Sequence, residues 1–303
     1  PYSIYTPGGA VDLNKRIAVS DGYEAEGSFN MAYVSMVRGS IPFLLLSYII
    51  PDWDIVSADE ITIEGENMEE MLERERLYMK ESMDAAIINA YQAAGADISI
   101  TGTISEVSYI AEEADTNLKI GDEIVRVNDV EIHSLDDLRA IIEELDEDEQ
   151  VQLDVVRDDE ELECYAYTYN TDDGMKIGVS LLTTYEYTTN PEVSITSKAS
   201  EAGSSGGLMM SLTIYNSLVP EDITGGKKIV GTGTIDIDGN VGEIGGVKYK
   251  LIGAVKNDAD VFICPEENYE EALSVAEDKN YDIQIVSVGT FLEAIEALEE
   301  LNN

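Results

Sequence analysis

The sequence is poor in basic residues and in histidine, and this scarcity narrows the partners that the protein can have. It contains 18 Lys and Arg against 62 Asp and Glu, one histidine, and a formal net charge of −44 over 303 residues. A field of that sign repels phosphate backbones and anionic lipid headgroups, so nucleic acid is a very poor candidate partner. The same field favours a small cationic substrate, although an acidic, solvated surface serves solubility as well.

Cysteines, metal-binding patterns and long apolar runs are also scarce. Cys164 and Cys264 are too few for a disulfide framework, and each lies in an apolar strand pattern that favours a core position. No Cys, His or carboxylate cluster has metal-ligand spacing, so we expect no metal and no other cofactor. The longest apolar run, 41–50, is shorter than the about 18–20 residues that cross a bilayer, and we expect buried core or a partner-facing segment there. Because the chain begins at Pro1, we expect that an upstream piece with any anchoring signal has been removed.

The apolar pattern predicts an α/β (α+β) fold long enough for two domains, or for one domain interrupted by another. Helices are expected at 69–94, 135–145, 205–218, 247–256, 268–278 and 289–301. Strands are expected within 11–40 and at 98–110, 122–132, 151–157, 161–169, 175–187, 192–199, 228–238, 260–264 and 282–287.

Ser205 is the candidate nucleophile because it lies in a glycine-rich turn that opens a predicted helix. Backbone N–H groups at a helix start can stabilise an alkoxide and the oxyanion of a tetrahedral intermediate. The only histidine, His133, is expected at the surface, so a lysine is the usual substitute base. Lys248 follows Gly245-Gly246-Val247 and precedes an apolar run, which favours it for this role. A base near neutral pH must be desolvated and kept away from carboxylates, since the pKa of free lysine is about 10.4.

Residues 193–301 resemble the proteolytic domain of Lon-type proteases. The run Gly203-Ser204-Ser205-Gly206-Gly207 corresponds to the family's Gly-Pro-Ser-Ala-Gly motif, and Gly245-Gly246-Val247-Lys248 corresponds to its Gly-Gly-Leu-Lys motif. The resemblance implies that Ser205 is the nucleophile, that Lys248 is the base and that Thr232 steadies the lysine. It also implies an oxyanion hole made by backbone N–H groups of Gly203, Ser204, Ser205 and Gly206.

The resemblance continues upstream and includes an inserted module. Residues 78–87 resemble the helix that begins the Lon domain, so the Lon-like fold is predicted to be split into 1–97 and 171–303. The module between them, 98–170, resembles a PDZ domain, because 118–132 matches that family's Gly-Asp-x-Ile strand and turn. A PDZ domain takes an extended peptide as an added strand, although the module could also be a spacer. The expected groove lies between the strand near 104–110 and the helix 135–145, with Ile104, Val107, Tyr109, Leu138 and Ile142.

A Lon fold with a PDZ module and no ATPase is similar to membrane-anchored bacterial proteases whose catalytic part faces outside the cell. The resemblance implies an ATP-independent serine endopeptidase for short or flexible peptides, including secreted signalling peptides, held at the membrane by an N-terminal helix that this sequence lacks. It leaves a homo-oligomer open, because Lon domains assemble into rings. Two alternatives remain: a non-catalytic adaptor that uses the PDZ-like groove and, less favoured, a GHMP-type small-molecule kinase with a similar Gly-Ser-Ser loop.

Overall fold

The computed structural model describes residues 2–198 and 200–302, so residues 1, 199 and 303 of the predicted domains, and the end of the predicted strand 192–199, lie outside the described residues. The chain divides into two compact units. Unit 1 comprises Pro1–Glu60, Ser82–Ser99 and Thr188–Asn303, and unit 2 comprises Ile61–Glu81 and Ile100–Tyr187. Unit 2 is larger than the predicted module 98–170, since it also contains 61–81 and 171–187.

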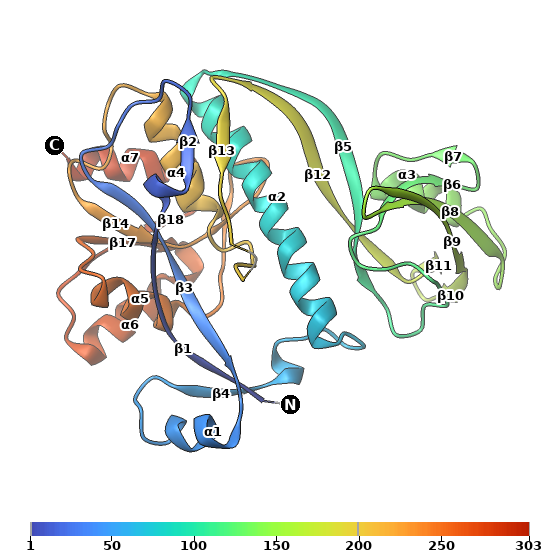
Figure 1. Cartoon of the computed structure of the whole chain (residues 1–303), viewed down its shortest axis with the longest axis horizontal. Helices are drawn as coiled ribbons and strands as arrows, with labels where there is room; N and C mark the ends of the chain where they lie inside the picture. The colour runs from blue at the N-terminus through green and yellow to red at the C-terminus, as the bar shows by residue number, and fades with distance from the viewer. Residues whose placement is uncertain (1, 199, 303) are drawn as a thin grey trace. The chain divides into compact units, whose positions relative to one another are not determined.

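Unit 1 is built on a six-stranded sheet of order β18-β17-β14-β3-β1-β4 (Figure 1). The strands are β1 (Tyr2–Asp12), β3 (Ser28–Arg38), β4 (Asp54–Ser57), β14 (Lys228–Gly231), β17 (Val261–Pro265) and β18 (Gln284–Val288). The four from β3 to β18 run parallel, while β1 is antiparallel to both of its neighbours. Val230 and Phe262 belong to one core cluster, and the alternate residues Ile229 and Ile263 are fully buried too. Both faces of these parallel strands are therefore covered.

The helices of unit 1 include α4 (Gly207–Leu218), α5 (Val247–Lys256), α6 (Glu266–Lys279), α7 (Phe291–Leu301) and the second half of α2 (Met68–Ala94). Helix α5 contacts β1, β3 and α6, whereas α4 contacts β3, α7 and the short strand β2 (Ile17–Val19), which pairs with β13 (Val193–Ile195). A further short pair, β15 (Thr234–Ile235) and β16 (Val241–Gly242), follows β14. The mixed α/β fold is confirmed, and these five helices lie within two residues of their predicted limits.

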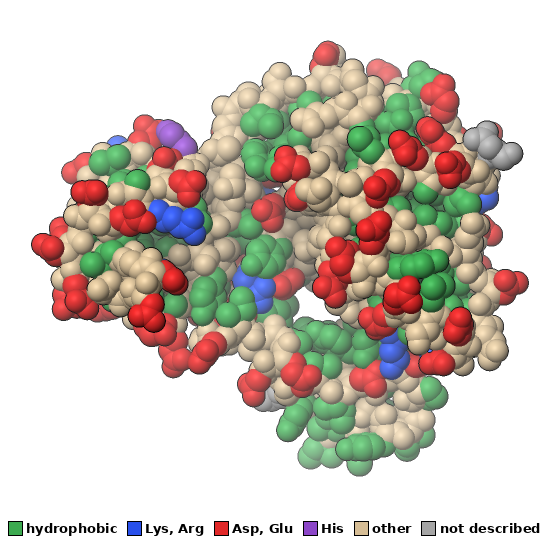
Figure 2. Space-filling view, turned by 180° about the vertical axis from the view of Figure 1, so that it is seen from behind, with side chains coloured by type: hydrophobic (Ala, Val, Ile, Leu, Met, Phe, Trp, Pro, Cys, Tyr) green, Lys and Arg blue, Asp and Glu red, His purple; other side chains and the backbone are tan. Residues whose placement is uncertain are grey.

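The apolar segment 41–50 is an exposed surface and not part of the core. It forms helix α1 (Ile41–Ser47), which has no buried residue, and the turn that follows. Ile41, Tyr48 and Ile49 are 76%, 82% and 77% exposed. Apolar side chains gather at the lower edge of the molecule in Figure 2, where Figure 1 places α1. The segment joins β3 to β4.

Unit 2 contains a sheet of order β12-β5-β6-β8-β9. Its elements are β5 (Asp97–Ile110), β6 (Glu123–Val127), β7 (Val130–Glu131), α3 (Leu135–Ile142), β8 (Gln150–Arg157), β9 (Glu160–Tyr167), the hairpin β10 (Tyr169–Thr171) and β11 (Gly174–Lys176), and β12 (Val179–Asn190). Its core joins buried residues of β5, β6, β8 and β9 to residues of α3, and Val179 and Leu181 of β12 pack against it.

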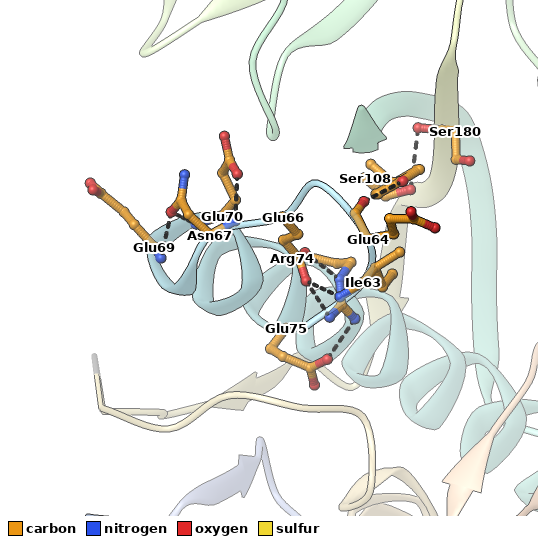
Figure 3. A network of polar contacts seen from close by, with 11 residues as sticks. Ile63, Glu64, Glu66, Asn67, Glu69, Glu70, Arg74, Glu75, Ser108 and Ser180 are labelled. Atoms are coloured by element: carbon orange, nitrogen blue, oxygen red, sulfur yellow. Dashed lines mark hydrogen bonds and ion pairs between the residues drawn. The ribbon is translucent and has the colours of Figure 1, made fainter. Parts of the chain in front are cut away.

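A buried arginine fixes the loop that leads into α2. Arg74 is 6% exposed and donates from Nε and Nη2 to Glu66 at 2.7 and 3.1 Å, and from Nη1 to Glu75 at 2.8 Å (Figure 3). The hydrogen bonds to Glu66 raise the pKa of Arg74 above its usual value. The Asn67 side chain accepts hydrogen bonds from the N–H groups of Glu69 and Glu70, as a helix N-cap does.

The ion pair between Arg157 and Asp122 should contribute strongly to the stability of unit 2. The Asp122 side chain is fully buried and receives hydrogen bonds from Nε and Nη2 of Arg157, each at 2.6 Å. Replacing Arg157 by Met leaves a buried carboxylate without its cation, so we expect the free energy of unfolding to fall by about 3–5 kcal/mol. The matched control is Arg126→Met, which removes a half-exposed pair with Asp154 and should cost at most about 1 kcal/mol. Urea unfolding curves measure both, and equal losses would contradict the prediction.

Candidate active site

The candidate nucleophile lies where the chain enters α4. Gly203 has a φ of +97°, a left-handed conformation that favours glycine, and Gly206 is the N-cap of the helix. Ser205, between them, is partly exposed. Gly206 stands where the Lon motif has alanine, and Met31 occupies the space, because an added Cβ would come within 2.0 Å of the Met31 sulfur.

The lysine that contacts Thr232 is Lys250, so the expectation that Thr232 steadies Lys248 is wrong. Lys250 Nζ donates to Thr232 Oγ1 at 3.1 Å, and Lys250 is only 3% exposed. Lys248 Nζ instead donates to Asp54 at 2.7 Å and lies 3.8 Å from Asp52. Lys248 thus belongs to an ion-pair cluster with two carboxylates, away from Thr232.

The two lysines differ because they lie on opposite sides of one helix. Residues two apart in an α-helix are separated by about 200° around its axis. In α5, position 250 shares its side with Val247 and Ala254, which are fully buried in the core, while position 248 faces β4. The spacing of apolar residues in α5 is visible in the sequence and would have selected Lys250. The Gly-Gly-x-Lys motif instead ends at the first lysine, Lys248.

Thr232 connects the Lys250 amine to the peptide group of Ser205, the candidate nucleophile. Its hydroxyl accepts from Lys250 Nζ and donates to the carbonyl oxygen of Ser205 at 3.0 Å. The same carbonyl accepts from Gly233 N at 2.8 Å. Thr232 is fully buried, so this chain of contacts is shielded from water. Among the described residues, Lys250 has no hydrogen bond to the Ser205 hydroxyl, a contact that often tightens only when substrate binds.

Burial lowers the pKa of Lys250 to about 8 by desolvating its charged form. The amine is thus partly unprotonated near neutral pH. For Asp54, the carboxyl that pairs with Lys248, two effects compete. Burial disfavours its charged form, but the hydrogen bonds from Lys248 and Tyr249 outweigh burial and lower the pKa of Asp54. Asp54 is therefore ionised at neutral pH and forms an ion pair with Lys248.

A second concave site lies in unit 2. A cavity of about 360 Å³ is lined by Tyr109, Leu138 and Ile142, as expected, and also by residues 177–180 at the start of β12. Gly178 has a φ of +73°, and its carbonyl accepts from Ala111 N at 2.8 Å. The cationic side chains of Arg139 and Lys176 are part of the lining.

The free strand edge beside the groove is that of β12, and Tyr109 is the one residue of the predicted strand 104–110 that lines the cavity. That segment belongs to β5, which is paired on both sides, with β12 and with β6, and so has no free backbone edge for a peptide. Val107 is fully buried in the core and Ile104 does not line the cavity. The expectation for these two residues is wrong, because the domain limit at 170 excluded the strand that forms the edge of the sheet.

The remaining candidates have structural positions. Cys164 and Cys264 are both buried and free, as expected, and burial raises the pKa of Cys264 to about 12. His133 is exposed beside Glu131. Within residues 2–198 and 200–302, no group of three or more His, Cys, Asp or Glu is arranged for a metal ion. Over the same residues, no helix combines the length and the apolar character needed to cross a membrane.

The free-energy cost of burying Lys250 predicts a stabilised variant. Between the folded pKa of about 8 and the ordinary 10.5, the unfolded chain holds a proton that the folded protein has released, so stability rises with pH across this interval. The cost is therefore fully present below about pH 8 and vanishes above about 10.5. Lys250→Met should raise the free energy of unfolding at pH 7 by about 1–3 kcal/mol, with the gain narrowing towards pH 10. Denaturation curves across this pH range test it, and Lys248→Met, which breaks a surface pair, should show no such narrowing.

Two segments of the chain match known protein domains. Residues 191–300 match the family model of the Lon protease (S16) C-terminal proteolytic domain, and residues 101–166 match that of the PDZ domain. The Lon protease of Campylobacter jejuni is 33% identical over 95 residues, which are 31% of this chain and 12% of that protein, so the match spans a small part of that relative. The PDZ domain of an SdrC-like protein from Listeria monocytogenes is 17% identical, with a TM-score of 0.25, and the match covers 28% of this chain and 93% of that one. Both resemblances seen in the motifs are confirmed: the chain contains a PDZ domain and a Lon-type proteolytic domain, which together support a serine peptidase.

Proposed function

We propose that the protein is an ATP-independent serine endopeptidase in which Ser205 is the nucleophile and Lys250 is the general base. One observation carries the proposal: a buried amine, with a pKa of about 8, is tied through Thr232 to the peptide group of a serine at a helix N-terminus. A serine–lysine pair needs that environment, because only an unprotonated amine can accept the hydroxyl proton.

The catalytic steps follow from these contacts. Neutral Lys250 uses one N–H to bind Thr232, which leaves its lone pair free for the Ser205 hydroxyl. As Lys250 accepts the proton, the Ser205 oxygen attacks the substrate carbonyl and forms a tetrahedral oxyanion beside the backbone N–H groups at the start of α4. The Lys250 ammonium then protonates the leaving amine, and the peptide bond breaks. Water hydrolyses the acyl-enzyme, with Lys250 again acting as base and then as acid.

The PDZ groove would recruit peptide substrates. β12 lies at the edge of its sheet, so an extended peptide can add to it as a further strand, with side chains in the cavity against α3. We propose short or flexible peptides as substrates, and the net charge of −44 favours cationic ones. The proposal includes action outside the cell, on secreted signalling peptides, by a protein that an upstream segment anchors to the membrane, and it leaves a homo-oligomer open.

Substitutions at the three polar positions test the chemistry. Ser205→Ala and Lys250→Met should each lower kcat for a fluorogenic peptide by about 10³-fold or more, whereas Lys248→Met should stay within a few-fold of wild type. The rate for wild type should rise with pH through about 8, as Lys250 loses its proton, and then level off. Full activity in Lys250→Met would remove Lys250 from the mechanism, and loss of activity only in Lys248→Met would reverse the assignment.

A variant in the groove separates recruitment from a spacer role. Leu135 is partly exposed and lines the cavity at the start of α3. Leu135→Asp adds a charge to an apolar wall, so KM for peptides of 20 or so residues should rise about 10-fold while cleavage of a tetrapeptide substrate stays unchanged. His133→Ala, at an exposed position outside the cavity, is the control. Equal KM values for the two variants would indicate a spacer or a different recruitment surface, and peptide binding without cleavage by wild type would favour the adaptor.

A further inference from the structure

A serine far away in the sequence holds the peptide group that precedes the candidate nucleophile. Ser82 lies on α2, within unit 1, and is only 2% exposed. Its hydroxyl donates to the carbonyl oxygen of Ser204 at 2.9 Å, across 122 positions of sequence. Ser82 takes no part in the proton transfers between Ser205 and Lys250, so its buried hydrogen bond must serve another role.

Packing fixes Ser82 against the first turn of α4. A Cβ added at Gly207 would lie 2.4 Å from the Ser82 hydroxyl oxygen and 2.6 Å from a methyl group of Ile235. Any side chain at position 207 would therefore push the helix start away from α2. The close approach brings the Ser82 hydroxyl within reach of the turn that holds Ser205.

The two peptide groups that flank the Ser205 side chain are both held by their carbonyl oxygens. The Ser204 carbonyl accepts from Ser82, and the Ser205 carbonyl accepts from Thr232 and Gly233. In a trans peptide group, the C=O and the following N–H point in opposite directions. Holding the Ser204 carbonyl towards α2 therefore directs the Ser205 N–H away from α2. In the described part of the chain, the N–H groups of Ser205 and Gly206 donate to no protein acceptor, so both are free for an oxyanion.

We propose that Ser82 is a positioning residue that aims the Ser205 N–H at the oxyanion of the tetrahedral intermediate. The inference rests on the proposed peptidase function and assigns one contact within it. A hydroxyl bond from another element defines the orientation of the Ser204–Ser205 peptide group before substrate arrives. Such preorganised donors act on the charge that develops in the transition state and add little to substrate binding.

Loss of the Ser82 hydroxyl should change the direction of the Ser205 N–H without unfolding the turn before α4. The Ser204 carbonyl also accepts from Gly207 N, at 3.2 Å, which keeps the turn closed in a Ser82→Ala variant. Removing an oxyanion-hole donor outright lowers kcat by about 10²–10³-fold, so a misaimed donor should lower kcat by about 10–100-fold with KM nearly constant. Ser82→Cys, which keeps the size and a weak donor, should fall between wild type and Ser82→Ala.

The test compares Ser82→Ala with Ser211→Ala in the full chain. Ser211 is a fully buried serine of α4 whose hydroxyl donates to the Gly207 carbonyl at 3.0 Å, so it matches Ser82 in burial and bond type but does not contact the Ser204 carbonyl. The measurements are kcat and KM for a fluorogenic peptide, thermal unfolding, and the inhibition constant of a peptide boronate. A boronate forms a tetrahedral adduct on a serine oxygen and places its own oxygen in the oxyanion hole.

The expected result is a parallel loss in Ser82→Ala: kcat falls and the boronate inhibition constant rises by the same factor of about 10–100, while Ser211→Ala keeps both values within about 2-fold. Unchanged boronate inhibition in Ser82→Ala, or equal losses in both variants, would overturn the role of Ser82 and leave the peptidase function standing. Peptide cleavage that persists in Ser205→Ala would instead overturn the peptidase function itself.

Discussion

The candidate site depends on one energetically costly arrangement, a buried amine that forms no ion pair with any described residue. Lys250 is almost completely buried, and the only hydrogen-bond partner of its side-chain amine in the described part of the chain is the hydroxyl of Thr232. In a chain with 62 acidic residues, keeping carboxylates away from one lysine requires a particular place in the fold. The core side of α5, against the parallel strands, provides it.

The same helix shows the alternative environment two residues earlier. Lys248 is paired with Asp54 and stands close to Asp52, which also binds Lys279 of α6. These ion pairs link β4 and the turn before it to the helices of unit 1. Lys248 thus ties a strand at the edge of the sheet to α5, while Lys250 is buried against Thr232. The distinction comes from direction around the helix axis and not from residue type.

Much of this organisation was predictable from the sequence, because local patterns carry it. The glycine-rich turn placed Ser205 at a helix start, and the apolar periods gave the helices of unit 1. Motifs alone could not choose between Lys248 and Lys250, since that choice needs the direction of each side chain in the folded helix. The groove wall was missed for a different reason: which strand has a free edge is a property of the whole sheet, and β12 joins it from beyond the predicted domain limit. The exposure of α1 likewise reflects tertiary position, because an apolar segment of that length is usually core.

The register of β12 against β5 determines which side chains of β12 face α3, and therefore which side chains of a peptide added at this edge would do so. Two side-chain bonds cross this pair, from Ser108 to the Ser180 carbonyl at 3.2 Å and from Thr184 to Glu106 at 2.9 Å. A slip by one residue would break both and would exchange the two faces of β12. An added strand inherits the alternation of its neighbour, so only every second side chain of a bound peptide can point towards α3. Recognition at this edge would thus depend on alternate residues of the peptide, and the residues between them could vary.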